Sequence, residues 1–261
     1  MTKLTRFLNR HPHWTAALLS LAMLTVFLVV GTVVTVMKWP AWNLHLIAFA
    51  LLGVIVAALV TASGWWRETG FRAPYEWRSL WLFWLPFVPF LVNLLAGGVN
   101  VADPALLLRF VVLALLTGFV EETLFRGLIL RVLLPTGIFR AALISASLFG
   151  GLHLLNVLSA SSLAYALLQV SYATAIGFAY AALAVRTGTI WPLILAHFAT
   201  NLAGFVAAGD MGLTGSVASR EILFAVVYTV VFGAYGTCLL RAQVSRRGAL
   251  VPNAQITQGD S

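Results

Sequence analysis

Long apolar runs make up most of this chain, and short segments rich in glycine, proline and charge separate them. A helix needs about 20 consecutive apolar residues to span a bilayer, and most of these runs are close to that length. The pattern predicts eight membrane-spanning helices, over residues 14–36, 44–64, 80–97, 104–133, 140–156, 162–185, 190–208 and 221–241. We therefore expect an all-α, polytopic membrane protein.

Several residues between the runs are typical of helix ends. Asp103 suits a helix N-cap that is followed by Pro104 in the first turn. Pro135 and Gly137 interrupt the chain after the fourth predicted span, and Gly188 suits the cap at the end of the sixth. These positions fix the boundaries of the central spans to within a few residues.

The composition supports a membrane protein and excludes other classes. Hydrophobic residues make up 61% of the chain and charged residues only 9%, whereas soluble domains are about one quarter charged. The net charge of +8 does not indicate nucleic-acid binding, because the basic residues are spread thinly between apolar segments. A single cysteine, Cys238, excludes an intrachain disulfide and any multi-cysteine metal site.

The basic residues also predict an orientation. With the N-terminus inside, 13 of the 16 fall on inner segments: Lys3, Arg6, Arg10, Arg67, Arg72, Arg78, Arg126, Arg131, Arg140, Arg186, Arg241, Arg246 and Arg247. The outer segments hold Lys38, Arg109 and Arg220. Positive charge is retained on the cytoplasmic side, so both ends of the eight-span chain are predicted to be cytoplasmic.

We expect three parts along the chain: three helices and an inner loop over 1–103, a core over 104–208, and a last helix with a cytoplasmic tail over 209–261. The inner loop around 65–79 is expected to lie on the membrane surface. The first apolar run is too long for a signal peptide, which predicts a retained span. The short connections favour a bacterial inner membrane.

Two adjacent carboxylates are out of place in this pattern. Glu121 and Glu122 lie well inside the fourth span, where a charge costs at least ~2.5 kcal/mol and usually marks a functional site. Glu122 shares a helix face with Arg126, and Glu121 is rotated by about 100° from it. We predict that Glu122 is a paired, orienting residue and Glu121 the reactive base. A structural ion pair without chemistry is the alternative.

Two histidines and an asparagine have matching depth. At ~1.5 Å per residue, Glu121 lies about 18 Å from the inner end of its span, His153 about 20 Å and Asn201 about 18 Å. His197 lies one turn before Asn201 on the same helix face. We expect these groups to form one polar layer on the cytoplasmic half of the membrane, in a conical cavity open to that side.

Such a layer suits hydrolysis by two routes. Glu121 with His153 would deprotonate a water, and His197 with Asn201 would stabilise an oxyanion. In the other route Glu121, His153 and His197 would bind a divalent metal such as zinc, which acidifies the water. The His-Glu-x-x-His motif is absent. The sequence leaves the cofactor open between a metal and none.

Three short motifs resemble those of a known family. They read Glu121-Glu122-Thr123-Leu124-Phe125-Arg126, Phe149-Gly150-Gly151-Leu152-His153 and His197-Phe198-Ala199-Thr200-Asn201. The pattern resembles the CPBP family (CAAX-processing and bacteriocin-processing, or Abi) of intramembrane proteases, which are related to the type II CAAX prenyl endopeptidases. The resemblance covers about 105–203. It implies hydrolysis of a peptide bond in a membrane-associated protein or peptide, with the roles given above.

Two other functions are compatible with the residues. Buried carboxylates and histidines also form proton relays, so a proton-coupled transporter is one alternative, although no inverted repeat is evident. A non-catalytic scaffold or immunity factor with the same fold is the other. The predicted partners are membrane lipid and a peptide or membrane-protein substrate, without nucleic acid. The sequence predicts neither the substrate nor an oligomeric state.

Overall fold

The computed structural model describes residues 3–159, 162–210 and 219–249. Its elements are α1 Lys3–Arg10, α2 Pro12–Val36, α3 Trp42–Ser63, η1 Trp77–Phe87, α4 Val88–Gly97, α5 Pro104–Glu121, η2 Glu122–Ile129, α6 Leu130–Leu133, η3 Leu134–Thr136, α7 Ile138–Leu152, η4 His153–Ser159, α8 Leu163–Thr187, α9 Trp191–Ala208 and α10 Ser219–Ala249. The described chain is all-helical, as predicted. The tail predicted beyond α10 lies outside the described residues.

Eight helical segments of the described chain are long and apolar enough to cross a membrane. They are Pro12–Val36, Trp42–Ser63, Trp77–Gly97, Pro104–Thr136, Ile138–Val157, Leu163–Thr187, Trp191–Ala208 and Glu221–Ser245. Each corresponds to one predicted span, so the predicted multi-pass membrane protein is confirmed. Hydropathy locates these helices because lipid requires both an apolar surface and internal pairing of every backbone polar group.

The caps predicted from the sequence are formed. The Asp103 carboxylate accepts a hydrogen bond from the backbone N–H of Ala105 at 2.9 Å, next to Pro104 in the first turn of α5. Gly188 ends α8 with a φ of 74°, in the left-handed region that favours glycine. Gly137 adopts a φ of 110° between η3 and α7. These turns set the lengths of the helices that carry the polar residues.

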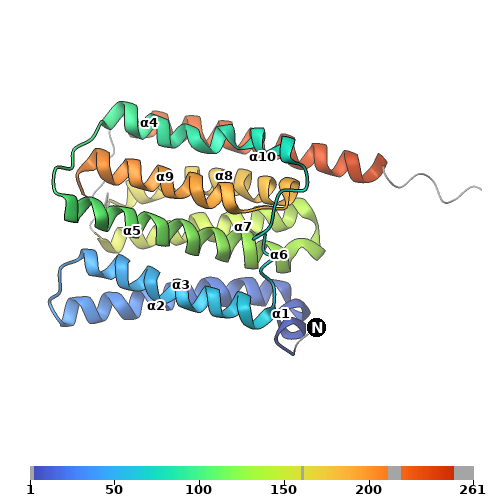
Figure 1. The fold of residues 1–261 in the computed structure, drawn as a ribbon, viewed down its shortest axis with the longest axis horizontal. Coiled ribbons are helices and arrows are strands. Elements are labelled where there is room, and N and C mark those ends of the chain that lie inside the picture. The colour runs from blue at the N-terminus through green and yellow to red at the C-terminus, as the bar shows by residue number, and fades with distance from the viewer. Residues whose placement is uncertain (1–2, 160–161, 211–218, 250–261) are drawn as a thin grey trace, which may run out of the picture.

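The helices run side by side along the long axis of the bundle (Figure 1). The α2–α3 hairpin packs against α5, α5 and α4 pack against α9, and α8 packs against both α7 and α10. We call the end that carries α1 and the last turns of α10 the terminal end. The opposite end, which carries the connections 37–41 and 98–103, is called the far end.

The terminal end is filled by aliphatic side chains from several helices. We define the aliphatic plug as Leu128, Leu133, Leu183, Ile190 and Leu193, all of which are fully buried or nearly so.

The 64–76 loop, part of the segment predicted to lie on the membrane surface, packs against the plug. Its Trp65 and Thr69 are buried, and its Gly70 carbonyl accepts a hydrogen bond from the N–H of Ile190 at 3.1 Å. Tyr75 N–H donates to the Thr187 carbonyl at 2.8 Å. These bonds tie the loop to the α8–α9 turn.

Candidate active site

The fourth span changes its helical geometry at the carboxylates. The α-helix α5 ends at Glu121, and η2 continues it as a π-helical segment of eight buried residues. The Phe125 carbonyl accepts from the N–H of Leu130, five residues on, and also from the Ser145 hydroxyl of α7 at 2.8 Å. Wide π turns occur often at functional sites, where they redirect side chains.

Glu122 and Arg126 form the buried ion pair predicted from their spacing. Arg126 Nη1 donates to Glu122 Oε1 at 3.0 Å, and both side chains are almost fully shielded from solvent. The guanidinium carbon also lies 4.2 Å from the ring centroid of Phe149 and 5.4 Å from that of Tyr180. Aromatic faces on one side and a carboxylate on the other hold the arginine in a single position.

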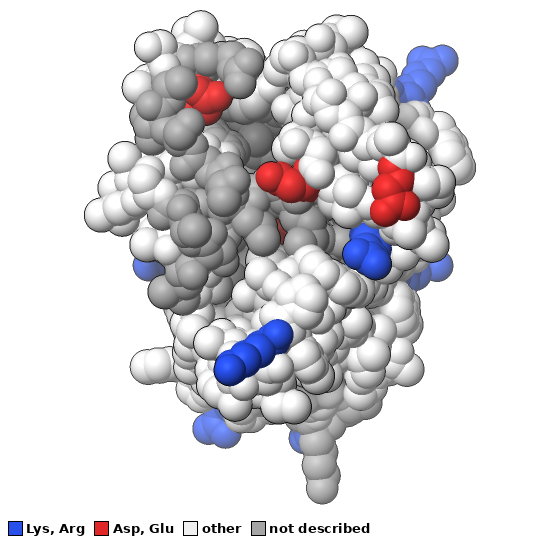
Figure 2. Space-filling view, turned by 90° about the vertical axis from the view of Figure 1, so that its left-hand side faces the viewer, with Lys and Arg blue, Asp and Glu red and all other residues white. Residues whose placement is uncertain are grey.

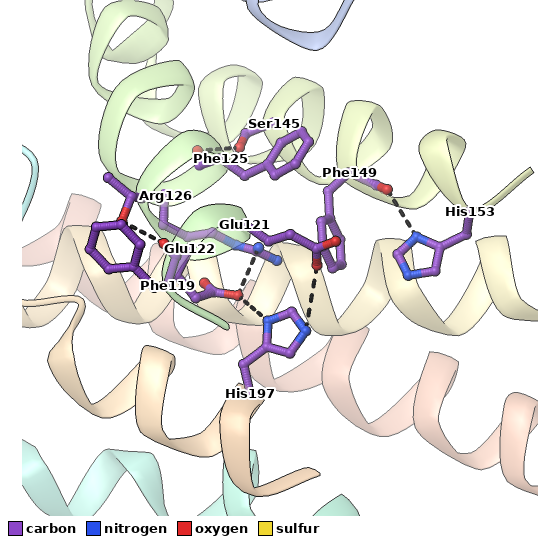
Figure 3. A network of polar contacts seen from close by, with 10 residues as sticks. Phe119, Glu121, Glu122, Phe125, Arg126, Ser145, Phe149, His153 and His197 are labelled. Atoms are coloured by element: carbon purple, nitrogen blue, oxygen red, sulfur yellow. Dashed lines mark hydrogen bonds and ion pairs between the residues drawn. The ribbon is translucent and has the colours of Figure 1, made fainter. Parts of the chain in front are cut away.

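His197 joins the two glutamates, as Figure 3 shows. Its Nδ1–H donates to Glu122 Oε1 at 2.7 Å, and its Nε2 lies 3.5 Å from Glu121 Oε2. Glu122 Oε1 therefore accepts from Arg126 and from His197. The sequence predicts that His197 acts with Asn201 beside Glu121, whereas its hydrogen bond to Glu122 was not predicted.

Two glycines allow this approach of helices. A Cβ atom on Gly118 of α5 would lie 3.0 Å from the carbonyl oxygen of Ile194 and 3.1 Å from the backbone nitrogen of Phe198, both on α9. A Cβ on Gly177 of α8 would lie 3.0 Å from Arg126 Nη2. Both glycines are therefore part of the geometry of the site. Sequence reasoning missed them, because their role depends on the facing helix.

His153 lies at the junction of α7 and η4. Its Nδ1–H donates to the Phe149 carbonyl at 3.1 Å, which leaves Nε2 as the other ring nitrogen. Within the described part of the chain, no hydrogen bond or ion pair joins His153 to Glu121, so their predicted partnership is not a direct contact. The ring of Phe149 contacts both histidine rings, with centroid separations of 5.0 Å to His153 and 6.2 Å to His197.

A cavity of about 1290 Å³ brings the predicted site residues together. Its lining includes Glu121, Glu122, Arg126, His153, His197 and Asn201. The remaining lining is largely apolar and aromatic, with a few amides such as Asn93 and Gln169. The prediction of one polar layer from three helices therefore agrees with the cavity lining, whereas the chemical role of each residue remains a prediction.

The cavity extends toward the far end of the bundle. Its lining reaches Val36, Ala41, Gly97 and Ala208, which lie at helix ends on that side. Figure 2 faces the same end of the bundle. The opening had been predicted at the end that carries the termini. That end holds the aliphatic plug, which depth along single helices could not reveal.

The three candidate metal ligands do not converge. Among the residues that the structure describes, no three histidine, cysteine or acidic side chains are grouped as a metal site. Both ring nitrogens of His197 already contact carboxylate oxygens, and His153 is turned toward Phe149. The mechanism below therefore contains no step through a metal.

Comparison with known families identifies the segment that carries this site. Residues 103–203 match the family model described as type II CAAX prenyl endopeptidase Rce1-like. This segment is Rce1-like. The match includes all three motifs and confirms the predicted resemblance to CPBP intramembrane proteases over these residues. It supports a CAAX-type intramembrane protease in general. No curated protein and no solved structure matched the chain.

Proposed function

We propose that this protein is an intramembrane endopeptidase that hydrolyses a peptide bond of a membrane-associated protein or peptide, with water activated by Glu121. The observation that carries the proposal is the contact of Glu121 with His197 inside a large cavity, within an Rce1-like segment. A carboxylate that lines a cavity large enough for a peptide and a water can act as the general base for that water.

In the proposed mechanism Glu121 and His153 receive the proton of the attacking water. With Nδ1–H donated to Phe149, neutral His153 presents Nε2 as an acceptor toward the cavity that both residues line. A water held between Nε2 and the Glu121 carboxylate would lose a proton as its oxygen attacks the scissile carbonyl. The same proton then passes to the leaving amine, so that the residues return to their starting state.

His197 acts mainly on the carboxylates in this scheme. Its Nδ1–H is already donated to Glu122, and a proton carried on Nε2 would face Glu121 Oε2, which lies 3.5 Å away. Glu122 and Arg126 fix the ring and compensate each other's charge. The oxyanion donor is then the Asn201 carboxamide, which lines the cavity one turn beyond His197.

The test compares wild type with Glu121→Gln in proteoliposomes, on a mixture of lipidated and unlipidated peptides. Removal of the base is expected to lower the cleavage rate by at least about 100-fold without loss of folded protein. Glu68→Gln is the matched control, because Glu68 is exposed in the 64–76 loop. Equal cleavage by wild type and Glu121→Gln would refute the proposal.

The same vesicles distinguish the alternatives predicted from the sequence. Proton-driven uptake of solute, without peptide cleavage, would identify a transporter. Neither uptake nor cleavage, with the protein folded, would favour a scaffold or immunity factor. Metal analysis of the purified protein, with a chelator control in the cleavage assay, decides between the metal-dependent and metal-free routes. The proposed location is a bacterial inner membrane.

A further inference from the structure

The charged side chains give the two ends of the bundle different surroundings. Exposed arginines at the terminal end include Arg6, Arg10, Arg67, Arg78 and Arg140. At the far end, the basic residues of the outer segments whose side chains are described are Lys38 and Arg109. Basic residues beside spans are retained on the cytoplasmic side, so the terminal end is the cytoplasmic one. The far end, toward which the cavity extends, then faces the opposite compartment.

The route from the site to the terminal end is closed by packing. Directly beyond Glu122 and Arg126, the fourth span continues with Leu128, Ile129 and Leu133, which are all fully buried or nearly so. The 64–76 loop packs over these residues at the terminal end, where Thr69 lies against Gly127. Interiors packed in this way leave few voids larger than a water molecule, so a peptide cannot enter from this end.

Hydrogen bonds hold the rim of the cavity at the far end, which we call the mouth. Asn100, in the connection between α4 and α5, donates through its side chain to the Ala207 carbonyl at 2.6 Å. Its backbone N–H donates to the Val206 carbonyl at 2.9 Å. Asn93 of α4 donates to the Thr200 carbonyl at 3.3 Å. These bonds fasten one side of the mouth to α9, the helix that carries His197.

From these observations we propose that the site takes its substrate from the extracytoplasmic side of the membrane, as an apolar peptide segment of an exported or membrane-anchored protein. The identity of the ligand as a substrate rests on the proposed function. The direction of access rests on the cavity geometry together with the distribution of basic residues. The lining of the mouth favours an apolar segment: Tyr165, Tyr172, Phe224 and Tyr228 lie along it, with the paired amides Asn156 and Gln169.

Access is tested by cysteine labelling, which does not require activity. In a Cys238→Ala background, cysteines replace Tyr165 near the mouth, Ile176 deeper in the cavity, and Arg67 at the terminal end. A membrane-impermeant maleimide is applied to right-side-out and to inside-out vesicles. We expect labelling at 165 and 176 only in right-side-out vesicles, and at 67 only in inside-out vesicles. Labelling after denaturation in detergent confirms that every cysteine is reactive.

Three labelling results would overturn the inference. Labelling of 165 and 176 only from the inside-out side would place the mouth in the cytoplasm. Labelling from both sides would show that the plug does not seal the cavity, and labelling from neither would show that the mouth is closed. Ile176→Cys places a smaller side chain in the cavity, so its folding is checked as well. Its yield after membrane extraction is compared with that of the parent protein.

A second assay uses an impermeant apolar peptide added outside each vesicle type. We expect cleavage by wild type in right-side-out vesicles and none in intact inside-out vesicles. Cleavage in inside-out vesicles alone would overturn the direction of access and leave the peptidase intact. If neither vesicle type cleaves and detergent does not restore cleavage, the proposed function fails, while the labelling result still decides the direction of access.

Discussion

At the residue scale, one oxygen atom organises the site. Glu122 Oε1 accepts hydrogen bonds from Arg126 at 3.0 Å and from His197 at 2.7 Å. The ion pair was predictable, because residues four apart on a helix face each other and an unpaired charge is costly in a membrane. The histidine contact was not, because it depends on how closely two helices pack.

The histidines show the same limit. Sequence depth placed His153 and His197 in one layer with Glu121, and the cavity lining agrees with that expectation. Depth carries no information about ring orientation, however, and the structure turns His153 to the Phe149 carbonyl and His197 to the carboxylates. Hydrogen bonds from ring nitrogens decide which nitrogen is available for chemistry.

Replacement of Arg126 by alanine is expected to destabilise the fold. It leaves the Glu122 charge buried with only His197 as a partner, and breaking a buried pair in this way costs about 3–5 kcal/mol. The measurement is the midpoint of denaturation in detergent, with residual cleavage as a second readout. Arg140→Ala, at an exposed arginine of α7, should shift it little. Equal midpoints for wild type and Arg126→Ala, with full activity, would contradict this account.

At the scale of elements, the sequence predicts helices well and their irregularities poorly. All eight spans and the caps at Asp103 and Gly188 follow from hydropathy and local turn chemistry. The π-helical segment from Glu122 to Ile129 does not, because apolar periodicity barely distinguishes it from an α-helix. The wider turn is stabilised by a neighbouring helix, because the Ser145 hydroxyl of α7 donates a hydrogen bond to the Phe125 carbonyl.

Gly118→Ala is expected to lower activity more than stability. The added methyl group would press on the α9 backbone beside His197, and a displacement of about 1 Å at a catalytic group can cost about 100-fold in rate. The overpacking itself should cost about 1–3 kcal/mol. Cleavage rate and denaturation midpoint are measured together.

Gly233→Ala on α10 is the control for that substitution, because nothing lies within 4 Å of its added methyl group. Alanine is a better helix former than glycine, so this variant should keep its activity and lose no stability. If Gly118→Ala behaved like Gly233→Ala in both measurements, the close approach of α5 and α9 would not be needed to position His197.

At the scale of the whole molecule, the charge bias predicts orientation and the packing decides access. Composition and long apolar runs predict a polytopic helical protein, because such runs suit a lipid environment. It could not show which end of the bundle is sealed. The plug brings together residues of η2, α6 and α8 with residues at the start of α9, and the 64–76 loop packs against it. No single segment of the sequence predicts this packing.

Topology reporters test the orientation independently of the cavity. Alkaline phosphatase folds only outside the cytoplasm, where its disulfides form. Fusions within the 37–41 and 98–103 connections should therefore be active, and a fusion within the 64–76 loop inactive. A fluorescent protein that folds in the cytoplasm should give the reciprocal pattern. The inverse result at all three positions would reverse the bundle in the membrane.

The aliphatic plug has an electrical consequence as well. A hydrolase site with mobile protons in mid-membrane would act as a conduit for protons if water reached it from both compartments. Leu128, Leu133 and Leu183 interpose a dry hydrocarbon layer between Glu122 and the terminal end. The proposed hydrolysis would then exchange water and protons with one compartment only, so the bilayer would keep its potential during the reaction.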